Sequence, residues 1–228
     1  MQSAMQVISA LASEILLVPV TLLPIINPLS SASVFVGLVG AREGLARQLA
    51  RQIAINSFVM IVATMLVGTY VLTLFGISLP VVRIGGGLLV AATAWRMLGA
   101  RADSPPSPAE EQAAALSDAQ PLQQAFYPMT FPLTTGPGTL AACITLGAHS
   151  GTVTPLHMVS GVLVAIGGAL LVVLVVYYTL RNAIKLVTRI GPNGAVVMQQ
   201  LVAFVLLCIG IQLVWAGWLD LTATGAAG

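Results

Sequence analysis

Charged residues are the scarcest class in this chain. Lys, Arg, Asp and Glu make up only 7% of the 228 residues, whereas hydrophobic residues make up 57%. A soluble domain of this size needs many more charges to cover its surface, so the composition indicates a protein that crosses a lipid bilayer several times. The net charge is only +2 and lies in the loops, and no basic face suited to nucleic acid is present.

The apolar stretches also lack the residue types that most chemistry needs. Their interiors contain no Asp, Glu, Lys or His, which argues against carboxylate proton relays and divalent-cation sites. We therefore expect no metal, no other cofactor and, without a nucleophile and base, no enzyme activity. Cys143 and Cys208 both lie in apolar stretches, where a thiol behaves as a small hydrophobe and a disulfide is not expected.

The apolar stretches number six, each near the roughly 20 residues that a helical crossing needs. They are residues 15–40, 53–75, 79–99, 125–148, 154–180 and 195–219. The predicted fold class is an all-α integral membrane protein with six transmembrane helices. Residues 1–14 are predicted to form an extension at the membrane surface rather than part of the first crossing.

Basic residues predict the orientation of these crossings. Eight of the nine follow the first, third and fifth stretches: Arg42, Arg47, Arg51, Arg96, Arg101, Arg181, Lys185 and Arg189. Because positive charges favour the cytoplasmic side, we predict that these loops face the cytoplasm and that both termini face outward.

A polar, proline-rich segment at 101–124 divides the chain into halves of three crossings. It is predicted to be a flexible cytoplasmic loop. Residues 1–100 and 125–228 are then two three-span repeats. Since each half crosses an odd number of times, related halves insert in opposite senses, which is a pattern of secondary transporters.

The first and fourth stretches are each interrupted at a similar place. Residues 23–31 (LPIINPLSS) and 131–139 (FPLTTGPGT) each carry two prolines beside small hydroxyl residues. A proline removes a helical hydrogen bond, and in hydrocarbon the freed backbone groups are tolerated only where protein or water surrounds them. Spans 1 and 4 are therefore predicted to be broken helices.

Each break reads as the start of a new helix. Asn27 suits the N-cap and Pro28 the first helical position, and Gly136 and Pro137 repeat the arrangement. Two helix starts aimed at the bilayer centre would form a small pocket that accepts an anion on backbone N–H groups. The candidate substrate-binding residues are Asn27, Pro28, Ser30, Ser31, Thr134, Thr135, Gly136, Pro137, Gly138 and Thr139. The alternative is a pair of ordinary proline kinks capped by neighbouring hydroxyls.

Two further polar positions lie within the crossings. Arg83 stands alone at the outward end of the third stretch, beside three glycines, and either snorkels to the interface or contacts a substrate or gate. Asn56 is expected to form a hydrogen bond between helices.

Several of these motifs together resemble the MarC family of bacterial inner-membrane proteins. They include Leu23-Pro24-x-x-Asn27-Pro28-Leu29, Arg83-Ile84-x-Gly86-Gly87-Leu88 and Gly136-Pro137-Gly138-Thr139. The resemblance implies a multi-pass protein of the bacterial inner (plasma) membrane, with six spans and with both outward-facing termini in the periplasm. It also implies kinship with the lysine-exporter superfamily and similarity to transporters of small neutral amino acids.

The leading hypothesis is a secondary transporter that moves a small, neutral, carboxylate-bearing solute by alternating access. A second is a non-transporting membrane protein that recruits a partner through the 101–124 loop. A third is a drug exporter linked to antibiotic resistance, which would need a large aromatic cavity, whereas only 6% of the residues are aromatic. The expected partners are the lipid bilayer and a small-molecule substrate, and a homo-oligomer remains open.

Overall fold

The computed structural model describes residues 2–40, 42–99, 125–149 and 155–225 of the chain. Within these ranges every element is helical. The elements are α1 (Gln2–Ile26), α2 (Pro28–Val39), α3 (Glu43–Leu74), α4 (Leu79–Gly99), η2 (Phe126–Thr134), α6 (Pro137–His149), α7 (Pro155–Arg181) and α8 (Ala183–Gly225). The predicted loop at 101–124 lies outside the described residues.

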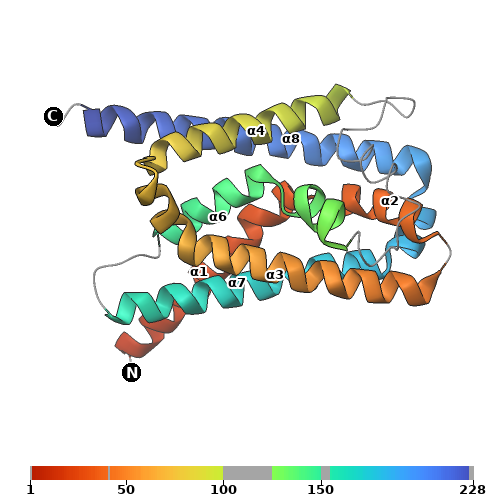
Figure 1. Ribbon diagram of the computed structural model, residues 1–228, viewed down its shortest axis with the longest axis horizontal. Helices are drawn as coiled ribbons and strands as arrows, with labels where there is room; N and C mark the ends of the chain where they lie inside the picture. The colour runs from red at the N-terminus through yellow and green to blue at the C-terminus, as the bar shows by residue number, and fades with distance from the viewer. Residues whose placement is uncertain (1, 41, 100–124, 150–154, 226–228) are drawn as a thin grey trace.

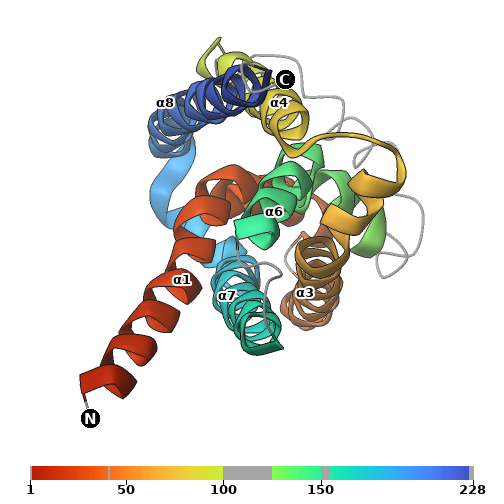
Figure 2. The same ribbon diagram turned by 90° about the vertical axis from the view of Figure 1, so that its left-hand side faces the viewer.

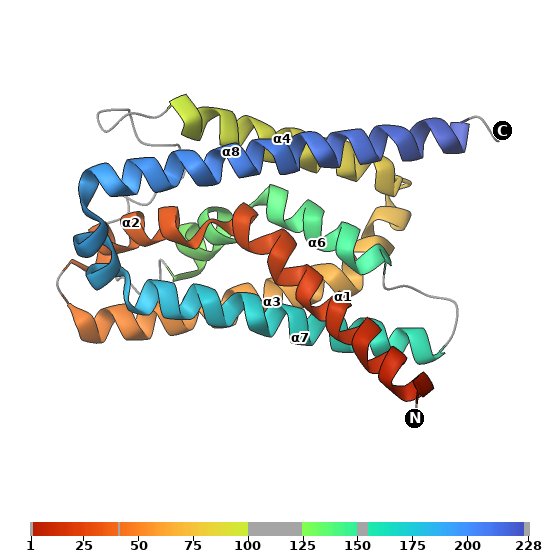
Figure 3. The same cartoon turned by 180° about the vertical axis from the view of Figure 1, so that it is seen from behind.

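The helices form three layers along one long axis. Helices α4 and α8 pack side by side as one outer layer, and α3 packs with α7 in the other (Figure 1). The short helices α2 and α6 lie between them with η2, as the view along the axis shows (Figure 2). Helix α1 starts outside the layers and runs obliquely into the middle one (Figure 3). The layer that carries the two predicted breaks is thus enclosed on both sides.

Hydropathy and length bear out an integral membrane protein. Five described segments are long and apolar enough to cross a bilayer: Ser9–Ile26, Glu43–Leu74, Leu79–Gly99, Val159–Arg181 and Val196–Ala223. The apolar helices α2 and α6 are shorter, with 12 and 13 residues. Alone, each reaches only about 20 Å at the usual helical rise, which is less than the roughly 30 Å of a hydrocarbon core.

The first crossing differs from its prediction at its start, whereas its break lies within the predicted stretch. Residues 2–14 are not a separate extension, because Gln2–Ile26 is one continuous helix. Pro24, like Pro19, lies inside that helix, and the break falls at Asn27, within the predicted stretch 23–31. Helix α2 then begins at Pro28, whose missing N–H costs nothing at a first helical position.

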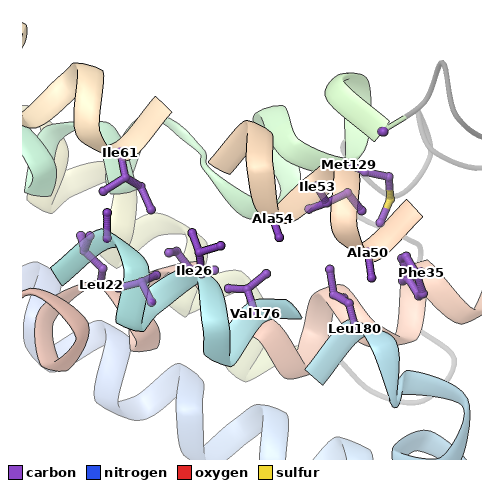
Figure 4. Packing of buried hydrophobic residues seen from close by; sticks show 14 of the residues in the cluster. Leu22, Ile26, Phe35, Ala50, Ile53, Ala54, Ile61, Met129, Val176 and Leu180 are labelled. Atoms are coloured by element: carbon purple, nitrogen blue, oxygen red, sulfur yellow. The ribbon is translucent and has the colours of Figure 1, made fainter. Parts of the chain in front are cut away.

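The main hydrophobic core joins the broken helices to the α3–α7 layer. Leu22, Ile26 and Phe35 from α1 and α2 are buried with side chains of α3 and α7, including Ile53 and Val176 (Figure 4). A smaller cluster of Val90, Ala94 and Leu206 lies between α4 and α8. The α4–α8 pair therefore has its own apolar contact, which meets the larger core at Ile25.

Helix α8 bends sharply near its start. Gly191 has φ 67° and ψ 170°, a conformation that favours glycine and that interrupts the helix. The part before Gly191 lies across the end of the bundle, and the part after it runs back along α4 (Figures 1 and 3).

The ends of the bundle differ in charge. The start of α1 and the end of α8 lie at one end of the long axis, and the α2–α3 connection, the end of α4 and the α7–α8 connection lie at the other (Figures 1 and 3). The second end carries the described basic residues that were used to predict orientation: Arg42, Arg47, Arg51, Arg96, Arg181, Lys185 and Arg189.

Arg83 does not stand alone, contrary to the prediction. Its guanidinium forms an ion pair with the Asp220 carboxylate, which joins α4 to the end of α8. The Arg83 side chain is 11% exposed and that of Asp220 is 46% exposed. The ion pair was not predicted, because Asp220 is far from Arg83 in the sequence and lies just past the last predicted crossing. A gating role for Arg83 stays a prediction.

Replacing Asp220 by asparagine is expected to destabilise the protein by about 1 kcal/mol. The half-exposed carboxylate limits the loss to that of an exposed pair, although the buried guanidinium loses a counter-charge. Thermal unfolding in detergent measures the effect, with the exposed Glu14→Gln as a control. The effects of Asp220→Asn and Arg83→Gln should be less than additive, and full additivity would show that the pair contributes nothing.

Candidate functional site

The first break is built around the side chain of Asn27. This residue has φ 46° and ψ 68°, in the left-handed region that asparagine tolerates better than most residues. Its Oδ1 accepts a hydrogen bond from the Ser30 backbone N–H at 3.4 Å, and its Nδ2 donates to the Ser30 hydroxyl at 2.6 Å. The predicted roles of Asn27 as N-cap and of Pro28 as first helical residue are confirmed.

The second break is longer and less regular. Tyr127 and Phe131, each followed by a proline, have extended backbones with φ −121° and ψ 126°, as expected because a proline ring excludes the helical conformation before it. The extended backbone at these two residues disrupts the regular α-helical hydrogen bonds of nearby carbonyls. The Thr130 hydroxyl donates to the Ala125 carbonyl at 2.6 Å, and the Thr134 hydroxyl donates to the Met129 carbonyl at 2.7 Å. These threonines stabilise the irregular backbone.

Helix α3 supplies polar side chains that face the second break. The Thr135 hydroxyl donates to the Ser57 hydroxyl at 3.4 Å, and the Asn56 amide donates to the Thr130 hydroxyl at 3.5 Å. The second bond confirms the interhelical role predicted for Asn56. Ser57 and Thr130 were missed as site residues. The adjacent polar pair Asn56 and Ser57, inside a long apolar run, was the available signal.

The two breaks lie next to each other. Helix α1 contacts α6, and α2 contacts η2. A Cβ built on Gly138 would lie 3.9 Å from Ile25 Cγ2 and 2.7 Å from Val90 Cγ2, so the second break touches both the first break and α4. From the middle of the bundle, α2 and α6 run toward opposite ends (Figures 1 and 3). The N-termini of both short helices therefore lie near mid-length of the bundle.

Buried polar groups concentrate at this junction. In the described part of the chain, the buried polar side chains all belong to the breaks or to the face of α3 beside them. They are Asn27, Ser31, Ser57, Thr130, Thr134, Thr135 and Thr139. Each is 7% exposed or less, so the junction is closed in this conformation. Burying polar groups costs free energy, and their collection at one place at the centre of an apolar bundle indicates a functional site.

The predicted site residues divide into three groups. Hydrogen bonds within the breaks occupy the first group: Asn27 bonds to Ser30, and Thr134 bonds to the Met129 carbonyl. Capping therefore accounts for these side chains in the closed conformation. Ser31, Thr135 and Thr139 are buried hydroxyls at the junction. Pro28 and Pro137 begin the short helices, and Gly136 and Gly138 flank the second start.

Neither a metal site nor a disulfide is formed by the residues that the structure describes. Within that part, no three His, Cys, Asp or Glu side chains gather to hold a metal ion. Cys143 and Cys208 are free thiols, the first buried and the second exposed.

An apolar helical bundle with a buried polar junction defines the chain as an integral membrane protein. The profile of the MarC family of integral membrane proteins matches residues 12–221. The inner membrane protein MarC of Escherichia coli O157:H7 is 33% identical over 213 residues, which cover 90% of this chain and 94% of that protein. The inner membrane protein MarC of Salmonella typhimurium (strain LT2) is 31% identical over 211 residues, with the same coverage.

The chain therefore belongs to the MarC family. No solved structure is significantly similar to it.

Proposed function

We propose that this protein is a secondary transporter of a small, neutral, carboxylate-bearing solute such as alanine or glycine. The proposal rests chiefly on one observation: the buried polar side chains of the described chain gather where two oppositely directed short helices begin. A helix start offers unpaired N–H groups and about half a positive charge. Two such starts provide an anion site without any formal protein charge.

The transport cycle proposed here depends on inverted repeats. Helices α1–α2, α3 and α4 correspond to η2–α6, α7 and α8, and each half crosses three times with its first crossing broken. Support comes from the pairing of equivalent helices, α3 with α7 and α4 with α8. Broken helices at equivalent places of two inverted halves commonly form transporter binding sites.

Alternating access then requires the layers to move relative to one another. The α4–α8 pair has its own small apolar cluster, which Ile25 of α1 also contacts. The main core joins α1, α2, α3 and α7 with the part of α8 before Gly191. We propose that the two bodies rock about the middle layer and expose the junction first to one side and then to the other. The closed junction described here is the occluded stage of that cycle.

The proposed orientation follows from charge. The end of the bundle with the clustered basic residues faces the cytoplasm, so both termini face the periplasm. Arg83 and Asp220 then lie near the periplasmic end of α4 and α8, where their ion pair would hold these helices together.

Binding of labelled alanine and glycine to the purified protein tests the proposed function. Saturable binding is expected for the wild type and loss of binding for Gly138→Leu, because its Cβ would lie 2.7 Å from Val90 Cγ2 and the side chain would crowd the second helix start. Asn27→Leu should also lose binding, since it removes the group that holds Ser30. Gly37→Leu is the matched control, because Gly37 on α2 faces open space. Absence of saturable binding to the wild type and to all variants would contradict the proposal.

A further inference from the structure

A cavity of about 100 Å³, open to the surface and lined by exposed polar residues, lies at the basic end of the bundle, far along the axis from the two breaks. It is formed where the start of α3 meets the α7–α8 connection. Three cationic side chains line it, Arg47, Arg181 and Lys185, together with one carboxylate, Glu43, and the amide of Asn182. The cations outnumber the carboxylate, so an anion is favoured there.

The surroundings hold parts of this cavity in place. The Arg181 guanidinium lies 5.9 Å from the centre of the Tyr177 ring, a cation–π distance that restrains its position. The Asn182 side chain donates to the Tyr178 carbonyl at 2.8 Å. Helix α3 begins beside the cavity, and the side chain of its N-cap residue, Arg42, forms no capping bond. The positive end of the α3 dipole therefore adds to the charge of the three cations.

The cavity lies at the level expected for lipid headgroups. Helix α3 has 32 residues, about 48 Å at the usual rise, whereas the hydrocarbon core is about 30 Å thick. Its polar first turns therefore extend beyond the hydrocarbon. The first part of α8 lies across the end of the bundle (Figure 3), with Ile184 and Val187 packed on the core and Lys185 and Arg189 exposed. A short amphipathic helix in this position is typical of a membrane surface.

We propose that this cavity binds the phosphate group of an anionic lipid of the cytoplasmic leaflet, held by Arg47, Arg181 and Lys185. Arginine and lysine are the usual partners of phosphate, and basic pockets between membrane helices on this side of a bilayer accept anionic headgroups. A soluble phosphate ion presents the same chemistry to the three side chains. Binding there would fasten α3 to α7 and α8, at a site separate from the proposed transport junction.

Lipid and phosphate binding to the full-length protein in uncharged detergent test the proposal. Phosphatidylglycerol and phosphatidylcholine are titrated and counted by native mass spectrometry, and radiolabelled inorganic phosphate is measured by equilibrium dialysis. Phosphatidylglycerol is expected to bind at least tenfold more tightly than phosphatidylcholine. Combining Arg47→Gln, Arg181→Gln and Lys185→Gln should remove that preference, and Glu43→Gln should strengthen it severalfold.

A second triple variant separates a site from general charge attraction. Arg51→Gln, Arg96→Gln and Arg189→Gln remove the same charge from the same end of the bundle, but these residues do not line the cavity. This variant should keep the preference, and thermal unfolding should show that both triple variants are folded. Tight binding of inorganic phosphate with the same dependence on the three cations would identify a soluble phosphate as the ligand. Two results would overturn the proposal. One is an equal loss of the phosphatidylglycerol preference in both triple variants. The other is a wild type that neither prefers phosphatidylglycerol to phosphatidylcholine nor binds inorganic phosphate.

Discussion

Replacing Gly87 by leucine is expected to cost about 4 kcal/mol of folding stability or more, the exceptional end of single substitutions. A Cβ on Gly87 would lie 2.7 Å from the Gly210 carbonyl oxygen and 2.8 Å from the Val214 amide nitrogen. Both atoms belong to the backbone of α8, so a change of rotamer cannot relieve the clash. Small residues allow membrane helices to approach this closely, and a larger one must force α4 and α8 apart.

Gly85→Leu is the matched control for this experiment. Gly85 lies two residues earlier on the same helix, is exposed and has open space where its Cβ would be. The added side chain has the same size and apolar character, but it meets no backbone. Thermal unfolding in detergent and the yield of monodisperse protein should be close to wild type for Gly85→Leu and strongly reduced for Gly87→Leu. Similar behaviour of the two variants would contradict the observed packing of α4 on α8.

The boundaries of some helices were predictable from sequence, but the neighbours of each helix were not. Helices α3 and α8 begin at Glu43 and Ala183, well before the predicted residues 53 and 195. Residues 79–99 were predicted as one crossing and form α4, Leu79–Gly99, because apolar length determines such a segment. The pairing of α4 with α8 depends on contacts between residues far apart in the chain, such as Gly87 with Gly210. No local pattern encodes that contact. The ion pair of Arg83 with Asp220 was missed for the same reason.

In the candidate site, the local backbone was predictable from sequence, but contacts between distant residues were not. Proline, glycine and asparagine have strong local preferences, so the helix starts at Pro28 and Pro137 were predicted correctly. The extended residues before Pro128 and Pro132 follow the same local rule. Phe131 lies in the predicted break, whereas Tyr127 lies in a part of the fourth stretch that was expected to be helical. The partner of Thr135 was not predictable, because Ser57 reaches the break only through the packing of α3.

Thr139→Val is expected to weaken binding of labelled alanine or glycine about tenfold, a loss that corresponds to one hydrogen bond, at about 1.4 kcal/mol. Thr139 lies in the first turn of α6 and is 2% exposed. Valine keeps nearly the same shape but has no hydroxyl, so the thermal unfolding of the protein should change little. This prediction depends on the proposed function and is measured by the same binding experiment, and Thr139→Ser should restore most of the affinity.

Thr134→Val distinguishes a residue that binds substrate from one that only holds the break. The Thr134 hydroxyl donates to the carbonyl of buried Met129, and the loss of one such hydrogen bond costs about 0.5–1.5 kcal/mol. We therefore expect Thr134→Val to lower the unfolding temperature more than Thr139→Val does. Thr93→Val, on the exposed face of α4, should change neither property. If Thr139→Val instead lowers stability as much as Thr134→Val and leaves solute affinity unchanged, the hydroxyls at the junction serve only to cap two proline breaks.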